Sequence, residues 1–435
     1  MFSIIDRILK KEEYKKVFEN IFSLTGLQFA SYVLPLITLP YLTLILGPER
    51  FGLTQYAISL ITYFMIFTDY GFNLSATREL ALIRDDKSKV SMIYSSVMTI
   101  KLLLTVISFV VLLLIVTLIP KFNNDANIYL LTFGMVIGYV LFPTWLFQGL
   151  EYMKYTSIIN IIGKVLFTVL IFVFIHQSSD YLLVPVINSL GNIVVGILGV
   201  YVSLTKFDIK LVKPTISSIK YHLKEGWHVF ISTIAINMYT TTNTFLLGLL
   251  TNNTLVGYYS IAEKIIVAVN GLLNPISQAL YPFISRKVNT EDKEDSVQFI
   301  RKLTKIMAVI GLILSVGLFI FGEMIILFLF GPTYSHSIII LRILSIIPFA
   351  VAVSTILGIQ TMLTFNYKKA FTTIVMLGGI FDVILGIILI LFYEAVGIAI
   401  SFATTEIFIT MAMLIFLERK GINIIKRGGV EYSEV

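Results

Sequence analysis

The chain has 435 residues, and charged residues make up only 14% of them. A soluble domain carries roughly 25% charged residues, and the mean hydropathy of this chain is +0.89. Such an apolar surplus cannot be buried in one soluble core, so the composition predicts a membrane protein. The absence of cysteine excludes disulfides, thiolate metal sites and cysteine nucleophiles.

The first 18 residues are basic and contain no small-residue cleavage site of a signal peptide. Their apolar residues Ile5, Ile8 and Leu9 predict a short amphipathic segment, 1–18, on the cytoplasmic surface of the membrane. A basic tail without regular structure is the alternative.

Twelve apolar stretches follow, and each is long enough to cross a bilayer, which takes roughly 20 residues. We expect spans at 19–46, 52–76, 90–119, 127–149, 156–176, 181–205, 222–250, 255–284, 303–330, 338–364, 368–392 and 395–417. They predict an all-α polytopic membrane protein of about twelve transmembrane helices. Residues 19–205 and 222–417 would each form a six-helix bundle.

Lysine and arginine lie almost entirely on one side of these spans. With the N-terminus inside, the inward segments hold 27 of them, whereas the outward turns hold only Arg50 and Lys121. Because cytoplasmic loops collect basic residues, this predicts a bacterial inner-membrane protein with both termini in the cytoplasm, including a tail at 418–435. The net charge of +7 is explained by topology and by contact with anionic lipid, so it does not require nucleic acid.

The longest polar stretch between spans, 206–221, predicts a cytoplasmic linker between the two halves. Pro214 stands where a helix can begin, and Ile216 and Ile219 start an apolar stripe, so we expect a surface helix there. A plain loop is the alternative.

Two outward turns resemble each other. Leu46-Gly47-Pro48-Glu49-Arg50-Phe51-Gly52 joins the first two spans, and Leu250-Thr251-Asn252-Asn253-Thr254-Leu255-Val256-Gly257 joins the seventh and eighth. Each turn places an apolar residue and a glycine at the start of the returning helix. A parallel repeat of this kind is typical of transporters.

Sequence motifs of enzymes are absent. The chain has no GxxxxGK[ST], HExxH or GxSxG motif, and its four histidines have no ligand spacing. We therefore expect no catalysis, no cofactor and no metal site. Asp85-Asp86 would be a metal-binding pair in a glycosyltransferase, but we favour an ordinary solvated loop.

Four basic residues fall within the spans: Lys101, Lys164, Lys264 and Arg342. A charge near the bilayer centre costs about 2.5–3.5 kcal/mol on insertion scales, so such residues face a bundle interior or a water-filled cavity. Lys101 and Lys264 lie about 14–16 Å deep at the helical rise per residue. Lys164 and Arg342 are shallower and can extend toward water. These four are our candidates for binding an anionic substrate, such as a phosphate with a hydrocarbon tail.

Three acids also fall within the spans. Asp69, Asp382 and Glu406 are candidates for ion coupling. Asp69 and Lys101 lie at similar depth on successive antiparallel helices, so a structural ion pair is the alternative for them. Asp382 and Glu406 are near mid-membrane, where protonated or paired core groups are the alternative to a coupling role.

Several short motifs occur together along nearly the whole chain. They are Leu39-Pro40-Tyr41-Leu42, Leu46-Gly47-Pro48-Glu49, Phe51-Gly52, Asp69-Tyr70-Gly71-Phe72-Asn73, Ala76-Thr77-Arg78-Glu79, Pro143-Thr144-Trp145-Leu146-Phe147-Gln148-Gly149-Leu150-Glu151, Val256-Gly257-Tyr258-Tyr259, and Phe330-Gly331-Pro332 with Tyr334. In these motifs the chain resembles polysaccharide-unit flippases of the Wzx type. That group belongs to the superfamily of multidrug-and-toxin exporters and the lipid II flippase.

The resemblance implies two six-helix bundles arranged as a V around a cavity that opens alternately to each side. It implies an undecaprenyl-diphosphate-linked oligosaccharide as cargo, with membrane lipids, a polysaccharide polymerase and a chain-length regulator as partners. It also implies that helices 1, 2, 7 and 8 line the cavity, which favours Lys264 as the phosphate contact. Two departures matter: Leu44 stands where many relatives carry arginine, and twelve spans rather than fourteen argue against murein precursors.

The leading hypothesis is therefore a flippase for lipid-linked units of O-antigen, capsule or a similar surface polysaccharide. The first alternative is a cation-coupled multidrug exporter of the same superfamily, whose cationic cargo suits an acidic cavity. The second is a membrane-embedded glycosyltransferase or polymerase, which would depend on Asp85 and Asp86.

Overall fold

The structure is a computed structural model that describes residues 12–274, 276–277, 280–281, 284, 288 and 293–424. Side chains are described from Ile37 onward, apart from those at 228, 232, 235–240 and 293. Most of the predicted amphipathic segment 1–18 and the end of the tail, 425–435, lie outside the described residues.

The described residues form helices and no strands, as the composition predicted. The first half of the chain contains α2 (Glu12–Asp69), α3 (Phe72–Ile83), α4 (Lys87–Leu118), α5 (Pro120–Asn123), α6 (Ala126–Thr132), α7 (Gly134–Leu141), α8 (Thr144–Gly149), α9 (Met153–Phe174), the 3-10 helix η1 (Ser178–Leu182) and α10 (Leu183–Lys206). The second half contains α11 (Ile216–Thr240), α12 (Thr242–Leu250), α13 (Asn253–Gly271), α15 (Lys293–Phe330), the 3-10 helix η2 (Pro332–Tyr334), α16 (His336–Leu344), α17 (Ile347–Thr355), the π-helix η3 (Ile356–Met362) and α18 (Lys368–Arg419).

Within the described residues, eight helical stretches are long and apolar enough to cross a membrane. Two of them contain two predicted spans each. Ile37–Ile83 is interrupted at Gly47, where φ is 70°, and Lys368–Arg419 is interrupted at Glu394, where φ is 51°. The predicted spans 222–250 and 255–284 correspond to α11 with α12 and to α13. The fold is therefore an all-α multi-pass membrane protein.

The helix predicted after Pro214 is present but is not a separate surface element. It begins at Ile216 and continues without interruption to Thr240 as α11. The non-helical residues before α11 are hydrogen-bonded to α4. Ser91 Oγ accepts from the Lys210 amide at 3.1 Å, and Ser95 Oγ accepts from the Val212 amide at 3.0 Å. Two hydroxyls one helical turn apart thus accept hydrogen bonds from backbone amides that have no partner within a helix.

The chain forms two compact units. One comprises residues 34–257, and the other comprises residues 1–33 with 258–435. The predicted division, with a linker at 206–221, follows chain order rather than contacts, and it stays a prediction.

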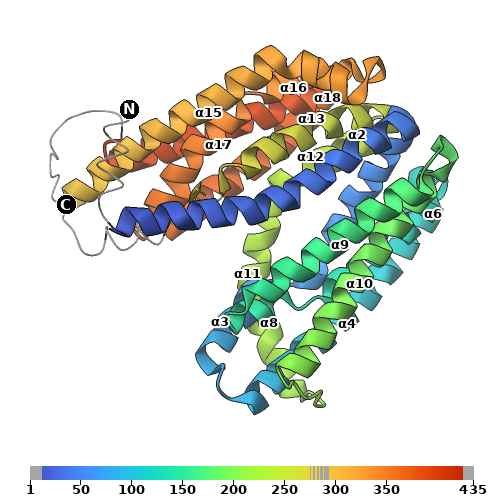
Figure 1. Ribbon diagram of the computed structural model, residues 1–435, viewed down its shortest axis with the longest axis vertical. Coiled ribbons are helices and arrows are strands. Elements are labelled where there is room, and N and C mark those ends of the chain that lie inside the picture. Colours follow the sequence, from blue (N-terminus) through green and yellow to red (C-terminus); the bar gives the residue numbers. More distant parts are fainter. Residues whose placement is uncertain are drawn as a thin grey trace. The chain divides into compact units, whose positions relative to one another are not determined.

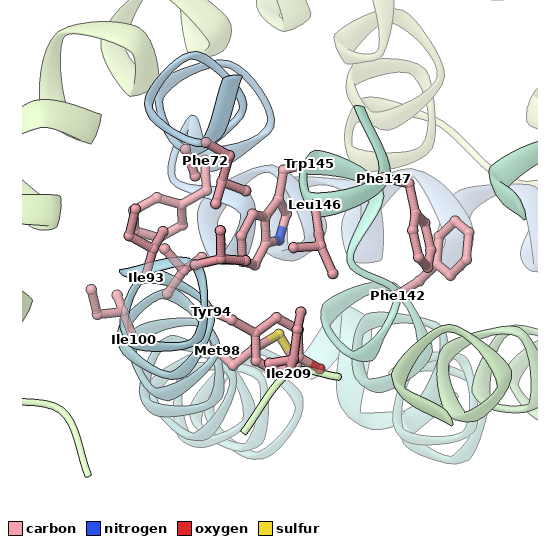
Figure 2. Packing of buried hydrophobic residues seen from close by; sticks show 14 of the residues in the cluster. Phe72, Ile93, Tyr94, Met98, Ile100, Phe142, Trp145, Leu146, Phe147 and Ile209 are labelled. Atoms are coloured by element: carbon pink, nitrogen blue, oxygen red, sulfur yellow. The ribbon is translucent and has the colours of Figure 1, made fainter. Parts of the chain in front are cut away.

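The unit 34–257 has an aromatic core beneath the Pro143–Glu151 motif. Trp145, Leu146 and Phe147 of α8 are buried together with residues of α3 and α4 (Figure 2). The rings of Trp145 and Tyr94 are 5.9 Å apart. Gly149 allows α8 to lie close to α3, because a Cβ at this position would be only 2.6 Å from the Leu80 Cβ. The motif therefore forms the packed end of this unit, and α9 and α10 run alongside each other beyond it (Figure 1).

The other unit is built around α15, α17 and α18 (Figure 1). Gly311 of α15 lies against Phe349 and Ala352 of α17, and any side chain there would meet backbone atoms. Small residues at such crossings let membrane helices pack closely without a hydrophobic driving force between them.

Candidate functional site

Lys101 and Asp69 form a buried ion pair in the unit 34–257. The Lys101 ammonium of α4 lies 3.6 Å from the Asp69 Oδ1 of α2, and the two side chains are 1% and 8% exposed. The ammonium also lies 5.2 Å from the ring centroid of Tyr139 on α7. Tyr139 in turn accepts a hydrogen bond from the Asn73 amide at 3.1 Å. The ion pair considered from the sequence is present.

The pair sits beside a break in the chain. Asp69 ends α2, and Tyr70 and Gly71 follow with φ of 49° and 76°. The Tyr70 ring stacks on Phe230 of α11 at 4.8 Å, and a Cβ on Gly71 would lie 2.9 Å from the Phe230 amide. The Lys101–Asp69 ion pair and the stacking of Tyr70 on Phe230 thus both stabilise the turn between α2 and α3. In this structure Lys101 is enclosed, and a contact between it and substrate stays a prediction.

Arg342 is paired rather than free. Its guanidinium on α16 donates to the Glu323 carboxylate of α15 at 2.8 Å, and both side chains are largely exposed. Lys164, in the middle of α9, is half-buried. Neither is enclosed in the way that Lys101 is.

The surroundings of Lys264 differ from those of Lys101. It is exposed on α13, directly beside the buried residues Ala262, Ile265 and Ile266. Among the residues that the structure describes, none forms a hydrogen bond or an ion pair with its ammonium. A cation left open within an apolar span is the kind of group that a phosphate can bind.

Asp382 and Glu406 come together within α18, on either side of its interruption. Asp382 is fully buried, and its Oδ1 accepts from the Ser401 hydroxyl at 2.8 Å and the Thr405 hydroxyl at 3.2 Å. Glu406 is 5% exposed, and it directly follows Thr405, whose hydroxyl binds the Asp382 carboxylate. Two like charges at this depth cannot both be ionised at little cost, so the pair is suited to holding a proton or a cation.

The two similar turns, at 46–52 and 250–257, contact each other within the unit 34–257. A Cβ on Gly52 would overlap the carbonyl oxygen of Asn253, and a Cβ on Gly257 would overlap the carbonyl oxygen of Pro48. The backbone of each turn therefore packs directly against the glycine of the other turn. Lys121 reinforces this end, because its ammonium donates to the carbonyl oxygens of Leu249 and Thr251 at 2.8 and 3.0 Å.

Asp85 is exposed, whereas Asp86 stands at the start of a helix. Asp86 caps α4 by accepting from the Ser88 and Lys89 amides, both at 3.1 Å. The Lys89 amide is the main cause that holds the pKa of Asp86 below its usual value. Within the described part of the chain, no group of three or more His, Cys, Asp and Glu side chains is placed to hold a metal ion.

Reasoning from charge alone missed two polar contacts. The His222 Nδ1 of α11 lies 3.4 Å from the Glu79 carboxylate of α3, and Gln360 in η3 is fully buried against Ser277. A polar side chain within an apolar stretch was the available signal for Gln360. Nothing local to the sequence joins Glu79 to His222, since 142 positions separate them.

Comparison with known proteins identifies the family. The family model described as "Polysaccharide biosynthesis protein" matches residues 17–288. A protein of Escherichia coli (strain K12) named "Putative O-antigen transporter" is 35% identical over 398 residues, which cover 92% of this chain and 96% of that protein. The chain belongs to the polysaccharide biosynthesis protein family. This family member is also 29% identical, over 91% of its length and 98% of the relative's, to a protein of the same name from Shigella dysenteriae.

Solved structures support the fold of this polysaccharide biosynthesis family member. An inward-facing multidrug resistance MATE family transporter of the MOP superfamily matches with a TM-score of 0.74 at 13% identity, covering 91% of this chain and 98% of that one. The lipid II flippase MurJ in an inward closed conformation matches with a TM-score of 0.75 at 15% identity, covering 91% and 87%. Identities this low establish the fold alone.

Proposed function

We propose that the protein is a flippase rather than an enzyme. It moves undecaprenyl-diphosphate-linked oligosaccharide units from the cytoplasmic to the outer leaflet, for assembly of O-antigen or another surface polysaccharide. The observation that carries this proposal is the 35% identity to a named O-antigen transporter across 92% of the chain. The likeness to a lipid II flippase supports a lipid-linked cargo.

Lys264 is the proposed contact for the diphosphate. It is exposed, it lies within an apolar span, and the part of the chain that the structure describes offers its ammonium no partner. The cargo's hydrocarbon tail can stay in lipid while the charged head binds the ammonium. Lys101, Lys164 and Arg342 remain secondary candidates, because each is buried, half-buried or paired.

We infer that the protein lies in the bacterial inner membrane with both termini in the cytoplasm. The basis is the distribution of basic residues, of which 27 lie in the predicted inward segments and two in the predicted outward turns. In that orientation the turns that carry Gly52 and Gly257 face outward. A polysaccharide polymerase and a chain-length regulator would then act on the delivered units.

The cargo crosses by alternating access, in which the outward turns separate and close again. The close approach at Gly52 and Gly257 supports this step, because backbone contacts free of side chains can open and re-form without repacking. Gly257→Ala should prevent closure and lower transport at least about tenfold while protein level holds. Normal surface glycan in that variant would remove these turns from the mechanism.

Asp382 and Glu406 are the proposed coupling groups, with Asp69 less suited because Lys101 neutralises it. Their burial and mutual repulsion favour uptake of one proton or cation. Asp382→Asn should make transport in vesicles insensitive to an imposed proton or sodium gradient. Unchanged gradient dependence would exclude this pair.

The first experiment is the leaflet distribution of lipid-linked oligosaccharide in a deletion strain. A flippase predicts that the oligosaccharide accumulates on the cytoplasmic face, that surface glycan is lost and that drug sensitivity is unchanged. Normal orientation of the lipid-linked pool would contradict the proposal.

A multidrug exporter is the second candidate, because the MATE likeness and the two buried acids are compatible with cationic cargo. Altered drug susceptibility with normal glycan in the same deletion strain would favour it. The open Lys264 favours an anionic cargo over this alternative.

A further inference from the structure

A pocket of about 350 Å³ lies in the unit that includes residues 258–435, and its lining includes Asn274, Ser277, Tyr281 and Ile359. Its volume falls at the lower end of the range typical of small-ligand sites. These residues carry one carboxamide, one hydroxyl and one phenol, and they carry no charge. Asn274 and Tyr281 are exposed, so a molecule can reach both.

The pocket's polar residues belong to a stripe within the predicted span 255–284. Asn274, Ser277 and Tyr281 follow at intervals of three and four residues, which is the spacing of one helical face. Asn270 precedes them at the end of α13, before the turn at 272–273. Unsatisfied polar groups in hydrocarbon cost several kcal/mol each. A polar stripe in an apolar span therefore marks a face that meets protein or a water-filled cavity rather than lipid.

Gln360 follows Ile359 in the chain and binds Ser277, and both of these residues line the pocket. It lies in the π-helix η3, a distortion that is frequent at functional sites. Its amide nitrogen donates to the Ser277 carbonyl oxygen at 2.7 Å and to the Ser277 hydroxyl at 3.0 Å. These two bonds fix the position of Ser277 at the edge of the pocket.

Two carboxamide oxygens in this region accept no hydrogen bond from the residues that the structure describes. They are the Oε1 of the fully buried Gln360 and the buried Oδ1 of Asn270. A buried acceptor without a donor costs about 1–3 kcal/mol. A protein retains such groups where a bound molecule or ordered water supplies the donor.

The chemistry of this lining indicates its ligand. A phosphate would call for cations, and a cationic drug would call for a carboxylate; the described lining has neither. The Asn274 carboxamide can both donate and accept hydrogen bonds, as can the Ser277 hydroxyl, so the two match the hydroxyls of a sugar ring. Tyr281 and Ile359 add apolar surface for the carbon face of a sugar. We propose that this pocket binds a neutral sugar of the lipid-linked cargo.

The proposal rests on the proposed function, since it assigns the sugar of a cargo whose diphosphate binds Lys264. α13 carries Lys264 and ends at Gly271, three residues before Asn274, so at most about 20 Å of chain separates the two positions. One molecule can therefore occupy both places, with its diphosphate at Lys264 and a sugar beyond it at the pocket. Lys264 would supply affinity for the head group, and the pocket would supply discrimination among glycans.

The test compares two probes on the full chain in lipid nanodiscs. One probe is the lipid-linked oligosaccharide extracted from a strain that lacks this protein, and the other is undecaprenyl diphosphate without sugars. The main variant is Asn274→Leu, which keeps the side-chain volume and removes the hydrogen bonds. Ser277→Ala is the second variant, and Thr373→Leu, an exposed substitution outside the pocket, is the matched control.

Wild-type protein should bind the glycosylated probe about tenfold more tightly than the bare diphosphate, as expected for two or so net hydrogen bonds. Asn274→Leu should abolish this preference, Ser277→Ala should reduce it, and affinity for the bare probe should not change. A preference retained in both variants, or absent in wild type, would overturn the pocket while leaving the flippase proposal intact. Binding of neither probe by wild type would instead contradict the proposed function itself.

Discussion

Lys101 and Lys264 lie at nearly the same depth in their spans, yet their surroundings differ completely. In the unit 34–257, Lys101 is enclosed with Asp69 and Tyr139. In the unit that includes 258–435, Lys264 is exposed and the described residues offer it no partner. A buried charge that is paired serves architecture, whereas an open charge in an apolar span is available to a ligand. Depth alone does not separate these two roles, but substitutions should.

The largest effect should come from breaking the buried pair. Lys101→Met leaves the Asp69 carboxylate buried without its cation, which costs about 3–5 kcal/mol. The purified variant should lose most of its thermal stability in detergent. The double variant Lys101→Met with Asp69→Asn should recover much of it, because no lone charge remains. A stable single variant that fails only in transport would place Lys101 among the substrate contacts.

Lys264→Ala should show the reverse pattern. Because the ammonium supports no packing, thermal stability and protein level should stay near wild type. Surface glycan should fall about tenfold, the value of one charge-assisted contact of roughly 1.5 kcal/mol. Lys264→Arg should retain most function. Normal surface glycan in Lys264→Ala would remove this residue from the site.

Arg342→Gln should have a small effect. Its pair with Glu323 is solvent-exposed, and exposed pairs contribute about 0.2–1 kcal/mol. Stability should therefore change little, and glycan export should be nearly normal. A loss of export comparable with that of Lys264→Ala would reassign Arg342 to substrate binding despite its partner.

Asp86→Ala should have the smallest effect, and that effect should depend on pH. The Lys89 and Ser88 amides lower the pKa of Asp86 in the folded protein, so its capping contribution is present above its unfolded pKa, about 3.9. The contribution is lost as pH falls through the lower folded pKa. Melting temperatures of wild type and variant should thus differ slightly at pH 7, begin to converge below about pH 4 and coincide below the folded pKa. Loss of glycan synthesis would instead revive the glycosyltransferase alternative.

The spans were predictable because the bilayer imposes a length and a composition on each helix. Their exact ends were less so: the chain between the first two spans turns at Gly47 with helix on both sides, and the helix after Pro214 continues into the seventh span. Local signals place a helix start, but they do not say whether the next residues leave the membrane surface.

The candidate site was predictable only in part. A charge within an apolar stretch is visible in the sequence, so Lys264, Asp382 and Glu406 could all be found. The burial of Lys101 depends on Asp69 and Tyr139, which other helices bring to it, and no local pattern encodes that meeting. Gln360 was overlooked because an uncharged amide stands out less than an ion, although its burial is just as consequential.

The hydroxyl ties between α4 and residues 210–212 bear on how the chain is made. The unit 34–257 includes α11 and α12, and Ser91 and Ser95 hold the stretch that leads to them. When the ribosome has synthesised only the first six spans, part of this unit is therefore still missing. If the chain were cut between Lys206 and Lys210, the two polypeptides would have to restore these hydrogen bonds by association. A cut after Gly257 would leave the bonds within one polypeptide.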